Sequence, residues 1–373
     1  MHAAIDIGTN SIHLVVARSS AEGGFEVVTT EKESVRLGSG GGDMKRLADD
    51  AMDRGVAAIG RMVEVATSLG ADITAVATSA VREAENRDEF VARVEAEFGL
   101  TISVIPGLEE ARLIHNGVVH AVDLTDRRAL IIDIGGGSTE FIISEGPELV
   151  EARSLRLGAI RLTQRFFGRF GPDEVPTAAA VKACRRYLRS ALSGVERDLG
   201  GHRPQLLVGA SGTVEAAAAM AAAARGDEPR QFNSATFTAA ELDAVVDTVL
   251  GVAAGERVGA VPGLETKRAD IIVGGILLLQ EIVRAFDLEV ITISEFALRE
   301  GVLFDRFPAG EGHLHDLRRN NTLRLAHQLD PDATHAETAA RLALQLFDRT
   351  ADVHQLGAEA RQLLELAAFV HNV

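Results

Sequence analysis

Positive charge, cysteine and long apolar runs are all scarce in this chain of 373 residues. The formal net charge of -16 argues against a general nucleic-acid or membrane-surface binder, because such proteins neutralise phosphates with excess lysine and arginine. Only four residues are lysines, so arginine, whose fork geometry suits phosphate, carries nearly all of the positive charge. Any polyanion must therefore meet a local basic patch or a metal ion.

The scarcity of cysteine and of apolar runs also bears on location. The single cysteine, Cys184, cannot form an internal disulfide, which fits a reducing compartment. The longest apolar tract begins at Ala216 and is too short to cross a bilayer. A strand begins almost at Met1, with no pattern of an export signal before it. We therefore expect a cytoplasmic protein that binds neither membranes nor nucleic acids.

An internal repeat is the strongest feature that the sequence does contain. "IDIGTNSIHLVVA" from Ile5 aligns with "IDIGGGSTEFIIS" from Ile132 without a gap. Asp6 pairs with Asp133 and His13 with Glu140. Each copy has the pattern of a strand, a tight polar turn and a returning strand, which predicts two β-hairpins.

The hairpin tips have the composition of a phosphate site. Glycines let backbone N–H groups approach a ligand closely, and hydroxyls add further donors. A flexible turn without a ligand is the alternative for one glycine cluster, but two facing tips favour the binding of one phosphate chain from both sides. The tip residues are Gly8, Thr9, Asn10 and Ser11 in the first copy, and Gly135, Gly136, Gly137 and Ser138 in the second.

Strands and helices alternate around each copy, which predicts two α/β domains with mainly parallel sheets that face each other across a cleft. Polar "DLTDRR" at 123–128 marks the linker, so the first domain spans 1–124, the second spans 125–306 and a helical tail spans 307–373. We expect strands at 25–37, 73–81, 101–106, 148–158, 205–211 and 288–294, and helices at 50–69, 87–98, 107–122, 160–167, 178–199, 212–224, 239–251 and 270–286.

Acidic residues at the tips point to a metal ion. Asp6 and Asp133 end strands at a site for anions, which is electrostatically costly unless a cation lies between acid and phosphate. Mg²⁺ suits such hard oxygen ligands, with waters and substrate phosphate completing its shell. Glu140, on the second returning strand, is placed to reach the same ion. The alternative is that each Asp caps local backbone donors.

Glu109 and Glu110 follow the turn at Pro106 and Gly107 and open the next helix. One of them, kept ionised by the helix N-terminus, is a candidate to take a proton from an attacking water. Acids in a first helical turn are also simply favourable to the helix. Spacing alone does not choose between the two glutamates.

Three further segments are candidates for phosphate binding. Ser211, Gly212 and Thr213 lie between a strand and a helix, where backbone N–H groups can hold phosphate or Ser211 can cap the helix. Arg82 and Arg299 follow predicted strands and are placed to neutralise phosphate. "GSGGGD" at 38–43 lacks the third glycine of a dinucleotide site, and no P-loop pattern occurs.

Seven segments together resemble the exopolyphosphatase and guanosine pentaphosphate phosphohydrolase family, of the superfamily of actin-like, sugar-kinase and Hsp70-like ATPases. The resemblance covers about residues 3–305. The segments, in order, are "AIDIGTNSIHLVVA", "ATSAVREAENRDEF", "GLEEARLIHNGV", "LIIDIGGGSTEFII", "LRLGAIRLTQRF", "VGASGTVEA" and "ALREGVL".

The resemblance implies two duplicated ribonuclease-H-like domains around a cleft. Its members remove the terminal phosphate of inorganic polyphosphate or the 5′ γ-phosphate of pppGpp, with Mg²⁺. The second acid of the family's "EEA" motif, the water-activating base, falls on Glu110. The family's metal-site acids fall on Asp133 and Glu140. Its phosphate loops fall on Gly8 to Ser11, Gly135 to Ser138 and Ser211 to Thr213.

Two departures from the family pattern stand out. The chain has Glu295 and Phe296 where the family commonly has Asp and Gly, so we expect Phe296 to narrow the cleft and treat any role copied to Arg299 as open. The tail is similar to the start of an HD-like domain, but Asn372 follows His371 where a His-Asp pair is needed, so we expect no separate metal chemistry there. A homodimer through the tail would be unsurprising.

The sequence thus favours exopolyphosphatase activity, with pppGpp hydrolysis as the alternative. A kinase or ATPase of the same superfamily shares the phosphate loops, although nothing in the sequence has the pattern of a sugar site. A non-catalytic polyphosphate or alarmone sensor is the second rival, favoured if the segment around Phe296 has disabled turnover.

Overall fold

The computed structural model describes residues 1–20, 24–38, 44–227, 233–307, 319, 322, 326 and 333–371. The chain divides into two compact units. The larger unit comprises Met1–Val119 and Leu124–Pro308, and the smaller comprises His120–Asp123 and Ala309–Val373.

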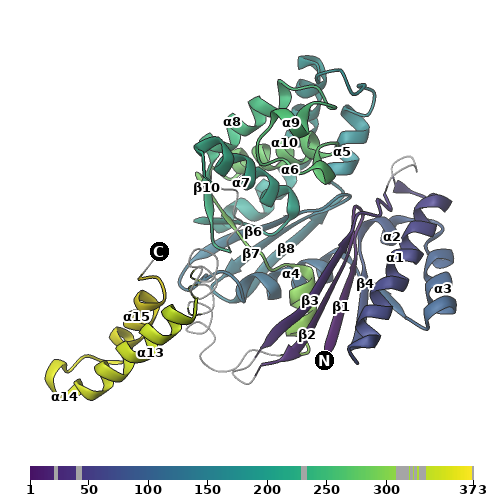
Figure 1. The fold of residues 1–373 in the computed structure, drawn as a ribbon. Coiled ribbons are helices and arrows are strands. Elements are labelled where there is room, and N and C mark those ends of the chain that lie inside the picture. The colour runs from purple at the N-terminus through teal and green to yellow at the C-terminus, as the bar shows by residue number, and fades with distance from the viewer. Residues whose placement is uncertain are drawn as a thin grey trace. The chain divides into compact units, whose positions relative to one another are not determined.

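Two sheets of the same design form the larger unit (Figure 1). In each sheet a central strand pairs antiparallel with the strand that follows it and parallel with a later strand. The first sheet has the order β3 (Phe25–Glu33), β2 (Ile12–Ser19), β1 (His2–Ile7), β4 (Asp72–Ala77) and β5 (Ile102–Val104). The second has the order β10 (Thr236–Thr238), β11 (Val290–Ile293), β9 (Leu206–Gly209), β6 (Arg128–Ile134), β7 (Thr139–Glu145) and β8 (Glu148–Leu155).

The sheets are mixed, so the expectation of mainly parallel sheets is wrong. The first sheet has two antiparallel and two parallel pairings, because each hairpin adds its own returning strand and a third strand follows it. The predicted repeat is confirmed: the order β3-β2-β1-β4-β5 matches β8-β7-β6-β9-β11. Both hairpins have the same register, since Asp6 lies opposite His13 and Asp133 opposite Glu140.

Helices pack against both sheets and complete two hydrophobic cores. Figure 1 shows α1 to α3 beside the first sheet and α5 to α10 gathered beside the second. The helices are α1 (Asp49–Ser68), α2 (Ser79–Glu83), α3 (Arg87–Phe98), α4 (Gly107–Val119), α5 (Ala159–Phe166), α6 (Ala178–Leu199), α7 (Gly212–Arg225), α8 (Ala239–Leu250), α9 (Arg257–Ala260), α10 (Ile272–Ala285) and α11 (Leu298–Phe304), with 3-10 turns η2 (Gly200–His202) and η3 (Thr266–Arg268).

Burial explains which helices the sequence predicts well. α10 is mostly apolar because it is enclosed by α5, α6, α7 and α8, and every residue from Ile272 to Val283 is buried, including Gln280 and Glu281, which bind arginines of α6. The predicted helices at 87–98 and 178–199 have the observed bounds. The short elements β10, α9 and α11 were not predicted, because three to seven residues show too little periodicity.

The smaller unit contains α13 (Ala333–Arg349), α14 (Ala351–His354) and α15 (Ala358–Phe369). A small core joins α13 and α15 through Ala340, Ala368 and Phe369. None of the helices in the described ranges of the chain combines the length and the apolar character of a membrane span. Much of the first part of the predicted helical tail, most of the "GSGGGD" stretch at 38–43, and Asn372 lie outside the described residues.

Two glycines allow α4 and α11 to pack backbone against backbone. A Cβ at Gly117 would lie 2.2 Å from the carbonyl oxygen of Ala297, and one at Gly301 would lie 1.8 Å from that of Leu113. Backbone atoms cannot move aside as a flexible side chain can. Glycine at both positions therefore sets the distance between α4 and α11.

Gly301→Ala is expected to lower the free energy of unfolding by about 2 kcal/mol or more, because the added methyl overpacks this contact. Urea denaturation measures the change. Gly194→Ala is the matched control, because no atom lies within 4 Å of a Cβ at this site in α6. That substitution is expected to stabilise by about 0.5–1 kcal/mol through helix propensity. Equal stability of the two variants would contradict the packing argument.

Candidate active site

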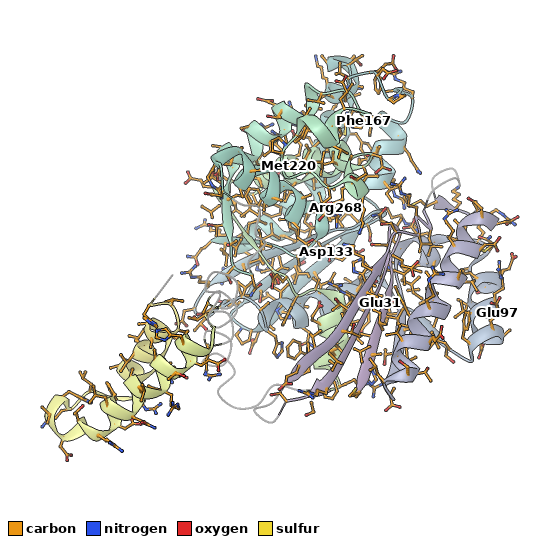
Figure 2. All side chains as sticks on the ribbon, viewed as in Figure 1. Glu31, Glu97, Asp133, Phe167, Met220 and Arg268 are labelled. Carbon is orange, nitrogen blue, oxygen red and sulfur yellow. The ribbon has the colours of Figure 1, made fainter. Side chains whose placement is uncertain are left out.

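A cavity of about 180 Å³ collects most of the predicted site residues. The two hairpin tips, the start of α4 and the start of α7 all contribute to its lining. Figure 2 shows Asp133 and Arg268, both of which line the cavity, in the central part of the larger unit. Of the predicted residues, the lining includes Asp6, Gly8, Thr9, Asn10, Ser11, Glu110, Asp133, Gly135, Gly136, Gly137, Ser138, Ser211, Gly212 and Thr213. Arg82 and Glu140 lie outside the lining.

The two tips close in the same way. Gly8 N–H donates to the carbonyl of Ser11 over 3.1 Å, and Gly135 N–H donates to that of Ser138 over 3.0 Å. A Cβ at Gly8 would lie 2.9 Å from the accepting oxygen, and one at Gly135 would lie 3.1 Å from it. Both turns are therefore too tight for most side chains.

The tips also meet each other. A Cβ at Gly136 would lie 3.0 Å from Cβ of Thr9, and one at Gly137 would lie 2.5 Å from Oγ of Ser79. The bare backbone of the second tip thus packs directly against the first half of the unit. This contact brings the backbone N–H groups of both copies to one cavity.

The loop that contains Ser211, Gly212 and Thr213 lies against the guanidinium of Arg268. Ser211 caps α7 by accepting from the N–H of Val214, which is the alternative role that the sequence left open. A Cβ at Gly212 would coincide with the guanidinium of Arg268, at 1.5 Å from Nη2. Glycine there lets a cation lie against the start of a helix. Both the guanidinium and the helix N-terminus attract anions.

Acidic side chains share the same small volume. The pKa of Asp6 is raised to about 7, chiefly by burial. Arg299 opposes this rise and Glu110 contributes to it. Burial, and then Glu110 and Asp6, hold the pKa of Asp133 well above its ordinary value. Burial, and then Glu110 and Asp133, do the same for Glu140, whose Oε1 accepts from Ser154 over 2.8 Å. These carboxyl groups repel one another when ionised.

The structure distinguishes the two glutamates that open α4. Glu109 forms a surface ion pair with Arg112. Glu110 is 7% exposed and lines the cavity. Its Oε2 accepts from Nη1 of Arg82 over 2.8 Å, and the same Nη1 donates to the carbonyl of Ile105. Burial raises the pKa of Glu110, and the ion pair with Arg82 limits that rise.

Arg82 therefore holds Glu110 and does not line the cavity where the sequence placed it as a phosphate ligand. The reason is local: β4 ends at Ala77 and α2 begins at Ser79, so Arg82 lies in a helical turn from which it reaches the start of α4. Its role in binding substrate stays a prediction.

Basic side chains that the sequence did not assign complete the cavity. His13, Lys32 and Arg268 all line it, as does Arg299. After burial, Arg299 and Arg268 are among the causes that lower the pKa of both His13 and Lys32, so the four groups lie close together. Nothing in the sequence around Lys32 or Arg268 marked them, because they come from a strand interior and a 3-10 turn. One feature of the sequence did mark His13, namely its alignment with Glu140 in the internal repeat.

Phe296 does not narrow the cavity, so that expectation is wrong. Its ring packs with Phe25 at 6.2 Å and with Phe304 at 6.2 Å between centroids, and only its neighbours Glu295 and Ala297 line the cavity. An aromatic side chain at this position finds apolar partners behind the cavity wall. Arg299, whose role was left open, lies in the wall itself.

A buried ion pair joins the two halves beside the tips. Nη2 of Arg161, on α5, lies 3.0 Å from Oε2 of Glu83, on α2, and both side chains are about nine-tenths buried. Arg161 also donates to the carbonyl of Gly137, and Ser79 donates to Glu83. The pair was not recognised in the sequence, because its members are 78 residues apart.

Within the described ranges, no three His, Cys, Asp or Glu side chains converge as a ready-made metal site. Two carboxylates in the lining, Asp6 and Asp133, are nevertheless the oxygen donors that Mg²⁺ uses together with water and phosphate. The chemistry of the donors therefore fits a magnesium ion that shares its shell with the substrate.

Comparisons with known proteins identify relatives over most of the larger unit. A profile of the Ppx/GppA phosphatase family matches residues 15–310. An exopolyphosphatase from Cytophaga hutchinsonii is 29% identical, with a TM-score of 0.75, over 82% of this chain and 96% of that chain. The Ppx/GppA family member from Aquifex aeolicus is 28% identical, with a TM-score of 0.68, over 82% and 96%. The α/β fold of the actin-like ATPase type that the sequence predicted is thereby confirmed.

Asp6→Asn tests the acidic cluster through its effect on stability. With a pKa of about 7 in the folded state and an ordinary value of 3.8, Asp6 binds its proton more tightly when the chain is folded. Its ionisation therefore destabilises the fold increasingly as the pH rises from about 4 to about 7. We expect the free energy of unfolding of the variant to match that of the wild type below pH 4 and to exceed it at pH 8 by up to about 4 kcal/mol, in urea denaturation with EDTA present. A difference that does not change with pH would contradict the shift.

Proposed function

The chain belongs to the Ppx/GppA phosphatase family, and we propose that it is an exopolyphosphatase that releases terminal orthophosphate from inorganic polyphosphate. Family membership supports the hydrolysis of phosphoanhydrides, and the exopolyphosphatase among its structural neighbours supports the particular substrate. The observation that carries the proposal is one cavity shared by a buried glutamate, two glycine-rich tips and four basic side chains. Each group suits one part of the reaction.

The tips and the basic side chains bind the phosphate chain. The N–H groups of Gly8 and Gly135 close the two tight turns, so the backbone N–H groups that follow them in each tip are the donors for phosphate, and they need no rearrangement when charge develops. Lys32, Arg268 and Arg299 neutralise the oxygens of the bound chain. Phosphoryl transfer depends on such positioning and electrostatic stabilisation more than on covalent chemistry by the protein.

Glu110 activates the attacking water. Arg82 binds Oε2, so Oε1 is the oxygen that receives the proton. The water oxygen forms a bond to the terminal phosphorus while the bridging P–O bond breaks, and the electron pair leaves with the shortened chain. Because its pKa is raised above the ordinary carboxyl value, Glu110 is a stronger base than an exposed glutamate.

Asp6 and Asp133 would hold Mg²⁺, with Glu140 close to Asp133 on the paired strand. A divalent cation would relieve the repulsion by which these acids raise one another's pKa. When bound, the ion supplies positive charge next to the phosphoryl oxygens. The cytoplasmic location and the homodimer stay predictions.

The cavity favours polyphosphate over pppGpp. Among the described residues, no Phe, Tyr or Trp side chain lines it, whereas nucleobases are commonly held by stacking on aromatic rings. An unbranched phosphate chain needs only donors and positive charge. Hydrolysis of pppGpp is the alternative, since both substrates present the same terminal phosphate.

Glu110→Gln is expected to lower the rate of phosphate release from polyphosphate by about 10²-fold or more, because the amide cannot accept the proton. A malachite-green assay measures the release, and equilibrium binding of the polyphosphate should stay near the wild-type value. Glu109→Gln is the matched control, since Glu109 pairs with Arg112 on the surface and lies outside the cavity. Loss of activity in the control alone would overturn the assignment.

A comparison of kcat/KM on long polyphosphate, tripolyphosphate and pppGpp, each with Mg²⁺, tests the choice of substrate. We expect the highest value for one of the two polyphosphates, because the cavity holds donors and cations and, among the residues that the structure describes, no Phe, Tyr or Trp ring for guanine. A higher value for pppGpp would favour the alternative. Tight binding of all three without release of phosphate would support a sensor.

A further inference from the structure

His13 connects the end of the second half of the unit to the first hairpin tip. It lies on β2, directly after the tip, and lines the cavity. Its Nδ1 lies 2.8 Å from Nη1 of Arg299, on α11, and its Nε2 lies 2.7 Å from Oγ of Ser11. The three side chains thus form a hydrogen-bonded row that ends at a hydroxyl in the phosphate cavity.

The donors and acceptors in this row are fixed by chemistry. A guanidinium has N–H groups and no acceptor, so Arg299 donates and Nδ1 of His13 accepts. Nδ1 therefore carries no proton, and the proton of the neutral ring is on Nε2. Nε2–H donates to Oγ of Ser11, which leaves the hydroxyl proton of Ser11 to point elsewhere.

The surroundings keep the imidazole neutral. Burial, and then Arg299, Lys32 and Arg268, hold the pKa of His13 well below its ordinary value. A second proton on the ring would lie on Nδ1, facing the guanidinium of Arg299. Neutral imidazole is accordingly the form that is compatible with both hydrogen bonds.

The repeat shows that this arrangement is particular to the first hairpin. Glu140 occupies the equivalent position in the second copy and accepts a hydrogen bond from Ser154. A carboxylate beside Ser11 would accept the hydroxyl proton and turn the lone pairs of Oγ toward the ligand. An imidazole with the proton on Nε2 instead donates to Oγ, so the hydroxyl proton of Ser11 is free to point toward the ligand.

We propose that His13, held by Arg299, is a positioning residue that makes Ser11 a hydrogen-bond donor to a phosphoryl oxygen of the substrate. Its role rests on the proposed function, because only an anionic substrate in this cavity gains from a donor at Ser11. The preference for an acceptor also discriminates against ligands that offer an O–H or N–H at this point. Arg299 contributes through His13 as well as through its charge.

The tautomer is measured first, on the wild-type protein without substrate. Long-range ¹H–¹⁵N correlation spectra of the ¹⁵N-histidine protein at pH 7 distinguish the two ring nitrogens, and the His13→Gln variant identifies the resonances of His13. We expect a neutral ring protonated on Nε2. A ring protonated on Nδ1, or on both nitrogens, would overturn the proposal.

A double-mutant cycle then tests whether His13 acts through Ser11. We expect Ser11→Ala and His13→Leu each to lower kcat/KM for polyphosphate by about tenfold to a hundredfold, as for a hydrogen bond to a charged group. The kcat/KM of the double variant should be about as low as that of Ser11→Ala alone, with no further loss from the substitution at His13. Losses that multiply would show that His13 acts independently of Ser11 and would overturn the proposal.

Two further variants separate positioning from folding. His13→Gln should retain most of the wild-type kcat/KM, because one amide both accepts from Arg299 and donates to Ser11. His2→Leu is the matched control, since His2 makes a similar bond of 2.8 Å to Thr74 at the far end of β1 and lies outside the cavity. It should lower stability but leave kcat/KM unchanged.

The outcomes for the two proposals are separable. A wild-type chain that releases phosphate from neither polyphosphate nor pppGpp would overturn the proposed function, and the tautomer of the same sample would still decide the hydrogen-bond arrangement. An active wild type with independent effects at Ser11 and His13 would overturn only the positioning role. If His13→Leu does not fold, the cycle is run with Ser11→Ala and His13→Phe, which keeps a ring of similar size without its hydrogen bonds and for which the same non-additivity is expected.

Discussion

Charge in a small volume is the constraint on which the rest of the larger unit depends. The cavity of about 180 Å³ must hold an anion next to Asp6, Asp133 and Glu110, all of which are costly to ionise there. Basic side chains and backbone donors compensate for this locally, although the whole chain carries a net charge of -16. Glycine is needed where those donors lie, because a Cβ at Gly137 or Gly212 would occupy the space of Ser79 or Arg268.

Duplication of one supersecondary unit explains how the donors come from both sides. The two halves keep the same strand order, the same register and the same hydrogen bond across each tip. They differ in side chains, since His13 stands opposite Asp6 and Glu140 opposite Asp133. The backbone thus supplies two equivalent tips to the proposed phosphate site, and the side chains give the two halves of that site different chemistry.

The sequence predicted the repeat, most long helices and about half of the cavity lining, because each is visible in a local pattern of residues. It did not reveal contacts between distant segments. Nothing local shows that Arg82 reaches Glu110, 28 residues away. Phe296 was expected in the cavity because its partners, Phe25 and Phe304, lie on other elements. The mixed sheets were not predicted, because the alternation of strands and helices does not show that the strand after each hairpin pairs antiparallel with the returning strand.

The short segment from Ser294 to Phe304 explains why these distant contacts matter together. Phe296 packs with Phe25 of the first sheet, and Arg299 reaches His13 on the strand that follows the first tip. Two residues later, Gly301 allows α11 to lie against α4, the helix that carries Glu110. A single helix of seven residues therefore supports both a phosphate-binding tip and the proposed base. If the proposed roles hold, a change in the position of α11 would act on substrate binding and on water activation at once.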